Sequence, residues 1–303
     1  MAVLTFGSIA LDTITMPSGK THRNVPGGSC SYFIHSAHFY SPVRVVAAVG
    51  RDFPKKYLDG FRRCRADLAG LQVIPDGTTF RWEGTYLPDM NNRTTDSLSF
   101  GVLASFQPVV PASFQDSPTV FLACAIPAMQ LRILSQMRGK PLVVCDTIEV
   151  YIRENRQDLD KVIRRSQGMI VNDSEARLLS GEDNLVATAL GLLRKYRLEF
   201  LVLKKGEHGG ILAYQNQAYP FPAYPLAKVA DPTGAGDSFA GGLVATLDQA
   251  KKIDLKTLKK AILNATVVAS FACEGVSLSR LSRVSLADCR ERAKKFAQAV
   301  SLG

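Results

Sequence analysis

The sequence predicts a doubly wound α/β fold, a mainly parallel sheet flanked by helices, with a small β-sheet lid. Short apolar runs rich in β-branched residues recur along the chain, and helical patterns separate them. One segment of about 30 residues breaks this rhythm with period-two alternation. With 303 residues and 46% hydrophobic content, the chain is expected to form one domain spanning residues 1–303.

The clearest strand candidates are short and apolar. They are Ala2–Phe6, Val43–Val49, Thr119–Cys124, Pro141–Cys145, Gly168–Val171 and Phe200–Lys204. Two stretches, 142–145 and 200–203, are apolar at every position, which is typical of central strands covered on both faces. Near the C-terminal end, helices are expected over Gly234–Leu247, Leu255–Cys273 and Ser285–Val300.

The predicted lid consists of two segments, about 11–26 and 76–106. The second alternates with period two at Phe80–Tyr86 and Thr94–Phe100 with no helix between, which indicates an antiparallel pair. The first has an extended stretch and a turn at Pro17–Lys20, and is expected to pair with it. Such a sheet is suited to cover a substrate and exclude water, and a solvent-facing ornament is the alternative.

Composition narrows the function classes. The six cysteines form no C-x-x-C pairs, which indicates reduced, packed thiols. The net charge of +10 comes from Lys and Arg spread through the chain, which favours solvated helix faces over a nucleic-acid site. No signal-peptide pattern is present, and no run reaches the roughly 18 apolar residues of a membrane span. We expect a cytoplasmic protein with no nucleic-acid and no membrane partner.

The most informative stretch is Asp231–Gly242, which has the pattern D-P-T-G-A-G-D-S-F-A-G-G. Pro232 and two close glycines predict a tight loop, and the small and apolar residues after Asp237 predict a helix. Amides at a helix start lack intrahelical partners and point, with the positive end of the dipole, toward an anion. Asp231–Asp237, which we call the anion loop, therefore indicates a phosphate site.

Asp237 is the candidate catalytic base. Bound phosphate would repel a purely structural carboxylate there, whereas a base taking a proton from an attacking hydroxyl suits the position. The backbone of Gly234, Ala235 and Gly236 would then stabilise the transferred phosphoryl group. A glycine-rich helix start that Asp237 merely caps is the alternative. The chain contains no G-x-x-x-x-G-K-[ST] loop, and Phe239 replaces the third glycine of a dinucleotide fingerprint.

The D-x-T-G-A-G-D core and the small-residue helix after it resemble the C-terminal signature of the ribokinase-like, or PfkB, family of carbohydrate and nucleoside kinases. Other family features occur in the expected order over most of the chain. The resemblance implies a ribokinase-like domain with the lid inserted in it, and ATP and Mg²⁺ as cofactors. It leaves a monovalent cation, K⁺, and a homodimer formed through the lid as further expectations.

Five residues are expected to contact the phosphate acceptor, and the resemblance implies three of them, Asp12, Gly27 and Gly28. Asp12 matches an acidic residue that binds substrate hydroxyls, with a turn aspartate as the alternative. Gly27 and Gly28 resemble the Gly-Gly motif that approaches the substrate and hinges the lid, with a simple helix-start turn as the alternative. Tyr32 stands where many members have asparagine, and is suited to stack on a substrate ring or narrow the pocket. Arg93 is a candidate to close onto the substrate, with an exposed loop arginine as the alternative.

A second set is implied for ATP and Mg²⁺. The K-x-G-x-x-G turn after a central strand resembles the element lining the nucleotide, with an ordinary hairpin turn as the alternative. The residues expected to bind ATP are Lys204, Gly206, Gly209, Thr233, Asn264 and Gly275. Asn172 and Glu175 match the N-x-x-E element that organises Mg²⁺ through water. By itself this tetrapeptide is also a plausible helix cap.

The sequence thus predicts an ATP-dependent phosphotransferase that phosphorylates a hydroxyl of a small sugar or sugar-like substrate. A nucleoside kinase of the same family is the alternative, favoured by the rings of Tyr32 and Phe33. A non-catalytic sugar or nucleotide sensor on the same fold is another, although the intact Gly-Ala-Gly-Asp core argues against it. A nicotinamide-dependent oxidoreductase is disfavoured by Phe239 and by the late position of the loop.

Overall fold

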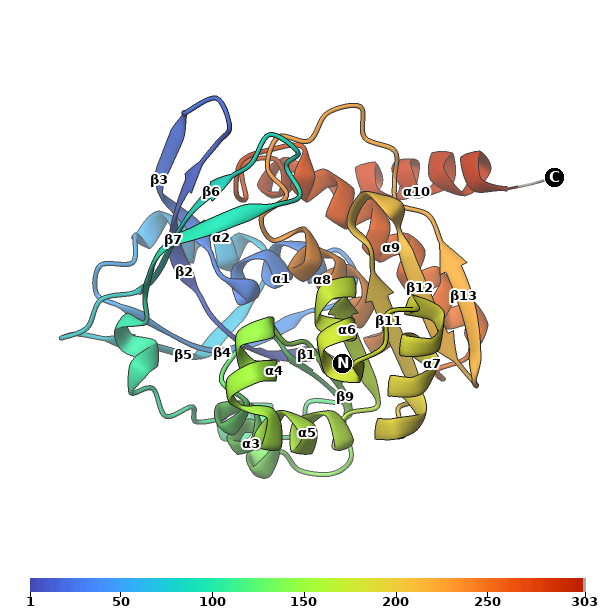
Figure 1. Cartoon of the computed structure of the whole chain (residues 1–303). Coiled ribbons are helices and arrows are strands. Elements are labelled where there is room, and N and C mark those ends of the chain that lie inside the picture. The colour runs from blue at the N-terminus through green and yellow to red at the C-terminus, as the bar shows by residue number, and fades with distance from the viewer. Residues whose placement is uncertain (302–303) are drawn as a thin grey trace.

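Nine segments form a large sheet in the order β13-β12-β11-β10-β9-β8-β1-β4-β5. The computed structural model describes residues 1–301 (Figure 1). Neighbours from β5 to β11 are parallel, and the two pairs at the other edge are antiparallel. The strands are β1 Val3–Phe6, β4 Val43–Gly50, β5 Asp67–Ile74, β8 Thr119–Leu122, β9 Leu142–Cys145, β10 Gly168–Asn172, β11 Phe200–Lys204, β12 Gly210–Tyr214 and β13 Gln217–Phe221.

Helices cover both faces of this sheet because its strands are apolar on both sides. In β4, Val43, Val45 and Ala47 pack with α1, α2, α8 and α9. Val46 and Ala48 pack toward the other face, which is covered by α3 to α7. The helices are α1 Ser29–Ala37, α2 Lys55–Arg63, α3 Pro127–Gln136, α4 Glu149–Glu154, α5 Arg156–Arg164, α6 Asp173–Ser180, α7 Leu185–Tyr196, α8 Ala235–Asp248, α9 Leu255–Cys273 and α10 Leu286–Val300.

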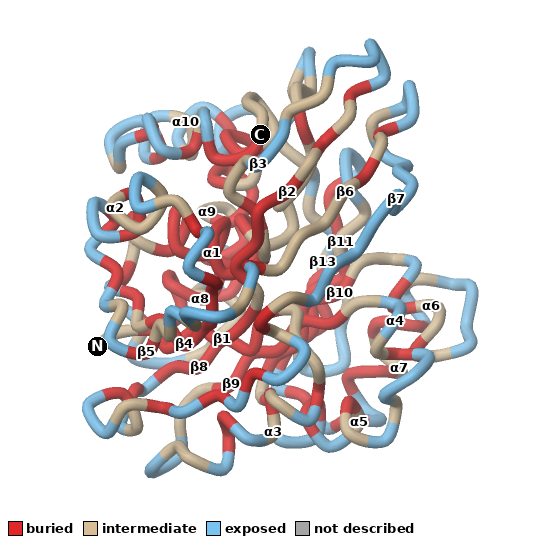
Figure 2. Tube along the Cα trace, turned by 90° about the vertical axis from the view of Figure 1, so that its left-hand side faces the viewer, coloured by how far each residue is buried: buried red, intermediate tan, exposed pale blue. Residues whose placement is uncertain are grey.

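The lid is a separate four-stranded sheet with the order β3-β2-β6-β7 (Figure 1). Its strands are β2 Ala10–Thr15, β3 Thr21–Gly27, β6 Phe80–Tyr86 and β7 Arg93–Ser99. The central β2–β6 pair is parallel and the two outer pairs are antiparallel, so the lid is a mixed sheet built from two hairpins. The edge strand β7 is exposed along its whole length (Figure 2).

The predicted fold class is confirmed, and the six predicted strands and three C-terminal helices are present. The predicted lid segments contain its four strands, apart from one residue at each outer end of the first hairpin. The edge strand β5 and the β12–β13 hairpin extend the large sheet beyond the prediction. Among the described residues, no helix combines the length and the apolarity needed to cross a membrane.

Candidate functional site

The strand order reverses at β1, which has β4 on one side and β8 on the other. Ligands of open parallel sheets bind at such a reversal, beyond the carboxyl ends of the strands. Ser29 Oγ lies 3.3 Å from Ser8 Oγ and donates to Cys124 O at 3.4 Å, which joins the residues after β1 and β8. The next three strands bring to the same edge Asp146, Asn172 and Lys204.

The anion loop starts helix α8 at Gly234, whose φ of 72° lies in the left-handed region that favours glycine. Ala235 N donates to Pro232 O at 3.1 Å. Among the described residues, the amides of Gly234, Gly236 and Asp237 have no acceptor. The sequence-based expectation that the Ala235 amide is free to bind a phosphate is therefore wrong for this conformation. The amides of Gly234 and Gly236 agree with the expectation.

Asp237 stands in the first turn of α8, at the mouth of this loop. Burial raises the pKa of its carboxyl group to about 7, and the negative charge of Asp146 acts in the same direction. The positive charges of Lys204 and Arg93 oppose this rise in pKa. A carboxyl group that titrates near neutral pH is suited to accept a proton from a hydroxyl.

Lys204 brings a half-buried cation to the anion loop. Its Nζ lies 2.8 Å from the position that a Cβ on Gly236 would occupy, and 3.9 Å from Asp146 Oδ2. Although burial opposes the charged form, the carboxylates of Asp146, Glu175 and Asp237 raise the pKa of Lys204 above its usual value. An ammonium group fixed at this point is suited to attract a phosphate oxygen in the loop.

Asp12, on β2, faces the Gly-Gly turn. A Cβ on Gly27 would overlap the Asp12 carboxylate, and Gly28 has a φ of 83°, so this turn requires both glycines. Asp12 is 3% exposed, and its Oδ1 has no hydrogen-bond partner within residues 1–301. Burial, together with the charges of Asp231 and Asp237, raises its pKa to about 8. An unpartnered buried oxygen is suited to accept a hydrogen bond from a substrate hydroxyl.

The structure corrects the interpretation of Tyr32 as a residue that stacks on a substrate ring. Its side chain is 1% exposed and packs in a cluster with residues of α9 such as Phe271. Phe33 is fully buried, with its ring stacked on Phe121 at a centroid distance of 4.6 Å. All nine residues of α1 are buried, so neither ring is available to a substrate.

Asn172 and Glu175 form a capping box at the start of α6. Asn172 Oδ1 accepts from Glu175 N at 2.8 Å, and Glu175 Oε2 accepts from Asn172 N at 2.8 Å. The capping alternative is therefore present in the structure. Burial, with the nearby charge of Asp146, raises the pKa of Glu175 to about 8. Carboxylate oxygens such as those of Glu175 and Asp146 are the hard donors that Mg²⁺ prefers with part of its water shell retained, but no three His, Cys, Asp or Glu side chains in residues 1–301 form a metal-binding cluster.

The turn predicted to line the nucleotide joins β11 to β12 and is a hairpin turn of the large sheet. Gly206 and Gly209 have φ values of 56° and 75°. A Cβ on Gly206 would meet no atom within 4 Å, so the backbone on that side is open. The turn thus has room for a ligand to approach the backbone closely.

The other predicted ATP residues lie in two places. Asn264 Nδ2, on α9, donates to Thr246 Oγ1 on α8 at 3.0 Å, so this amide joins two helices. Gly275 lies just beyond the end of α9. The Thr233 hydroxyl, in the anion loop, is 2.8 Å from Tyr86 Oη in the lid.

The lid reaches across the site to the turn after β11. At its tip, Asn91 Nδ2 donates to Glu207 Oε1 at 3.2 Å. Arg93 is exposed on β7, with its guanidinium 5.7 Å from the centroid of the Trp82 ring. The positive charge of Arg93 lowers the pKa of Asp237.

A sequence model of the pfkB family carbohydrate kinases matches residues 19–283. The chain belongs to the PfkB family. It is 28% identical over 259 residues to a cytidine kinase of Thermococcus kodakarensis, covering 83% of this chain and 90% of that protein.

Solved structures confirm the ribokinase-like fold of this PfkB kinase. A Burkholderia thailandensis nucleoside kinase in complex with inosine matches with a TM-score of 0.80 and 19% identity, covering 97% of this chain and 96% of that one. An Escherichia coli structure that contains ATP and Mg²⁺ matches with a TM-score of 0.79 and 19% identity, covering 97% and 99%. The predicted class, a phosphotransferase acting on a hydroxyl group, is thereby confirmed.

Three residues of the PfkB site were not singled out from the sequence: Asp146, Asp231 and Tyr86. Asp146 directly follows an apolar strand, and Asn172 and Lys204 each end one, and this shared position at the carboxyl end of a strand is the signal that points to Asp146. Asp231 lies inside the recognised motif but was given no separate role. Tyr86 ends a lid strand and carries no local signal of its contact with the anion loop.

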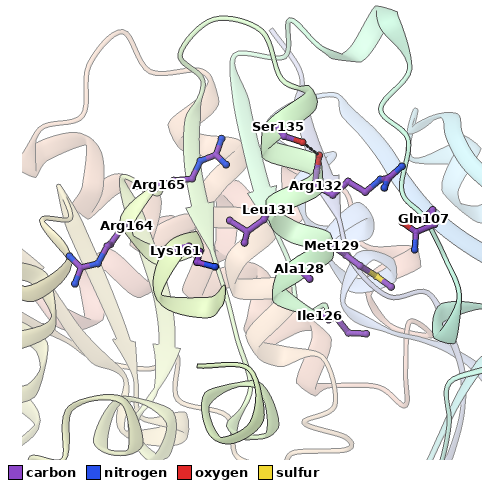
Figure 3. A pocket seen from close by; sticks show the side chains of 10 residues that line it. All are labelled: Gln107, Ile126, Ala128, Met129, Leu131, Arg132, Ser135, Lys161, Arg164 and Arg165. Carbon is purple, nitrogen blue, oxygen red and sulfur yellow. Dashed lines mark hydrogen bonds between the residues drawn. The ribbon is translucent and has the colours of Figure 1, made fainter. Parts of the chain in front are cut away.

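A groove of about 870 Å³ lies between α3 and α5, outside the PfkB site (Figure 3). Ile126, Met129 and Leu131 line it, and none of the predicted site residues does. Its basic lining residues are Arg132, Lys161, Arg164 and Arg165.

Proposed function

We propose that this protein transfers the γ-phosphoryl group of ATP to a hydroxyl of a nucleoside, with Asp237 as the general base. The observation that carries this proposal is the position of Asp237 beside the free amides of Gly234 and Gly236, with a pKa raised to about 7. This arrangement combines a proton acceptor and an anion site at one point, as phosphoryl transfer requires.

In the proposed reaction, the acceptor lies under the lid with one hydroxyl bound to Asp12 and the reacting hydroxyl toward Asp237. Asp237 takes the proton as the hydroxyl oxygen attacks phosphorus. The amides of Gly234, Gly236 and Asp237, together with Lys204, stabilise the negative charge on the phosphoryl oxygens. Mg²⁺, held by Asn172 and Glu175 partly through water, would neutralise charge on the phosphates of ATP.

The nucleotide in this proposal lies along the β11–β12 turn, near Gly206 and Gly209, and extends toward Asn264 and Gly275. The open backbone at Gly206 supports this orientation. Thr233 then has two contacts in this proposal. One is with ATP, and the other is between its hydroxyl and that of Tyr86. Arg93, on the lid, supplies a positive charge that lowers the pKa of Asp237.

A nucleoside is the proposed acceptor because the cytidine kinase similarity extends over most of both chains. The argument from the rings of Tyr32 and Phe33 no longer supports it, since both are buried. A small sugar is the second candidate. Its support is the match of 33% identity over 92 residues with a Klebsiella pneumoniae fructokinase, covering 30% of each chain.

The test is ADP formation from Mg·ATP with cytidine, other nucleosides, ribose and fructose, for the wild-type protein and Asp237→Asn. We expect turnover with a nucleoside and a loss of about 10² to 10⁴ in kcat in the variant. ATP binding without turnover on any acceptor would favour the sensor function instead. Near-normal turnover of Asp237→Asn would remove Asp237 as the base.

A homodimer through the lid is proposed from β7, whose seven residues are all exposed at the sheet edge. Pairing of such an edge with a second copy would satisfy its free backbone groups. Leu98, which is 47% exposed, is the residue to change. Light scattering should give a dimer mass for the wild type and a monomer mass for Leu98→Lys. A wild-type monomer at assay concentrations would contradict the proposal.

Two further expectations are kept as proposals. Activation by K⁺ would appear as higher turnover in KCl than in LiCl at equal ionic strength, and equal rates would remove it. A cytoplasmic location is consistent with the use of ATP, and imaging of a tagged chain in its own cell tests it.

A further inference from the structure

A partly buried chain of hydrogen bonds joins the lid to the anion loop at two points. At the first, Tyr86 Oη on β6 lies 2.8 Å from Thr233 Oγ1. At the second, Ser277 Oγ donates to Pro26 O on β3 at 2.5 Å. Both strands belong to the lid, whereas Thr233 belongs to the anion loop and Ser277 to the turn after α9.

Asp231 connects these two points. Its Oδ1 accepts from Thr233 N at 2.9 Å, and its Oδ2 accepts from Ser277 N at 2.8 Å. Both carboxylate oxygens are thus engaged by backbone amides, one on each side. Asp231 is 1% exposed and Ser277 3% exposed, so water does not compete strongly for these bonds.

Backbone strain in this region points to the same connection. Ser277 adopts a φ of 53°, a left-handed conformation that is costly for a residue other than glycine. This conformation is the one in which Ser277 donates from its amide to Asp231 and from its hydroxyl to Pro26. The surrounding contacts therefore hold a strained residue in place at the junction of lid and loop.

We propose that Tyr86 is a positioning residue which couples closure of the lid to the geometry of the anion loop. With the lid closed, the Tyr86 hydroxyl holds Thr233, and through Asp231 it fixes the start of the loop that carries the free amides. When the lid lifts, this contact is lost and the loop is less ordered. Phosphoryl transfer is thereby favoured when an acceptor is enclosed and disfavoured toward water, a consequence that rests on the proposed kinase function.

The first test needs no ligand: hydrogen–deuterium exchange of the unliganded full chain. Tyr86→Phe should make the hydrogen-bonded amides of the anion loop, those of Asp231, Thr233 and Ala235, exchange about fivefold faster, the effect of losing one hydrogen bond. Thr233→Val should do the same, and the double variant should show no further increase, because both changes remove one shared contact. Unchanged exchange in Tyr86→Phe, or additive effects in the double variant, would overturn the proposal.

Tyr57→Phe is the matched control. The Tyr57 hydroxyl also bonds the lid, since it donates to Asn24 O on β3 at 3.0 Å, but its contact is to lid backbone rather than to the anion loop. We expect its exchange in 231–237 to equal that of the wild type. An equal acceleration in Tyr57→Phe would mean that general loosening of the lid is responsible, and would contradict a specific role of Tyr86.

The second test is kinetic, with Mg·ATP and cytidine. Tyr86→Phe should lower kcat about fivefold while KM for ATP stays within about twofold, and should raise ATP hydrolysis relative to cytidine phosphorylation. A proportionate fall in both reactions would overturn the coupling. If the wild type phosphorylates no acceptor, the proposed function fails, whereas the exchange experiment still decides the role of Tyr86.

Discussion

The ring of Tyr32 lies directly behind Gly234, so closely that a Cβ at Gly234 would overlap its Cγ and Cδ atoms. Helix α1 thereby supports the backbone of the anion loop from below. Tyr32 determines how this loop is shaped and has no direct access to a substrate. The relationship also explains why the loop needs glycine at this position for two separate reasons, space and backbone conformation.

Gly234→Ala should therefore lower stability and activity together. The left-handed φ of 72° costs about 1–2 kcal/mol for alanine, and the overlap with Tyr32 adds about 1–3 kcal/mol. Gly139→Ala is the control, because Gly139 has a φ of 70° but no atom within 4 Å of its Cβ position. Denaturant unfolding should show a clearly larger loss for Gly234→Ala, and equal losses would mean that the contact with Tyr32 does not matter.

Asp237 should set the acid limb of the pH–rate profile. Because a general base must be ionised and burial raises the pKa of Asp237 to about 7, kcat/KM should fall about tenfold per pH unit below that value. Asp237→Asn should abolish this limb along with most of the rate. Asp248→Asn removes a buried carboxylate at the far end of the same helix, where it accepts from Ser41 Oγ at 2.6 Å. This control should lose stability but keep the limb.

Removing the charge of Lys204 and removing the charge of Asp146 should shift the midpoint of this acid limb in opposite directions. Lys204→Met removes a positive charge that lowers the pKa of Asp237, so the midpoint should rise. Asp146→Asn removes a negative charge that raises it, so the midpoint should fall. Shifts of about 1 unit are typical of single charges this near. Midpoints moving the same way in both variants would show that these charges do not act on the base.

Asp12→Asn should stabilise the unliganded protein at pH 8. The folded-state pKa of Asp12, about 8, exceeds its ordinary value of 3.8, so wild-type stability from this group is lost as pH rises from about 4 to 8. An uncharged amide avoids this loss, which we put at about 1–3 kcal/mol. Thermal unfolding should give a Tm advantage that grows from pH 5 to pH 8. A constant difference over this range would contradict the assignment.

Local patterns in the sequence predicted the anion loop, and the resemblance to the PfkB family added the other elements of the candidate site. The anion loop, the Gly-Gly turn and the N-x-x-E element each depend on neighbouring residues, because tight turns and helix starts are short-range structures. The position of Asp237 in the first turn of a helix followed from the same local rules. Lys204 was implied by the resemblance of the K-x-G-x-x-G turn, and it stands at the end of a continuously apolar strand.

Helix α1 shows where local rules fail. Periodicity indicates which face of a helix is buried only when another face is exposed, and all nine residues of α1 are buried. The direction of the Tyr32 side chain was therefore not predictable, and the interpretation as a stacking residue was wrong. The packing of α1 against α8 and α9 decided the direction of the Tyr32 side chain.

The sequence by itself determined the fold class, six apolar strands of the large sheet, the three C-terminal helices and the loop that carries the base, since these follow from apolar periodicity and turn chemistry. Only the tertiary structure decided the electrostatics around Asp237 and the bond between Tyr86 and Thr233. Asp146 and Lys204 meet because parallel strands align their carboxyl ends at one edge of the sheet. Tyr86 and Thr233 are 147 positions apart, and their contact depends on where the lid folds over the large sheet.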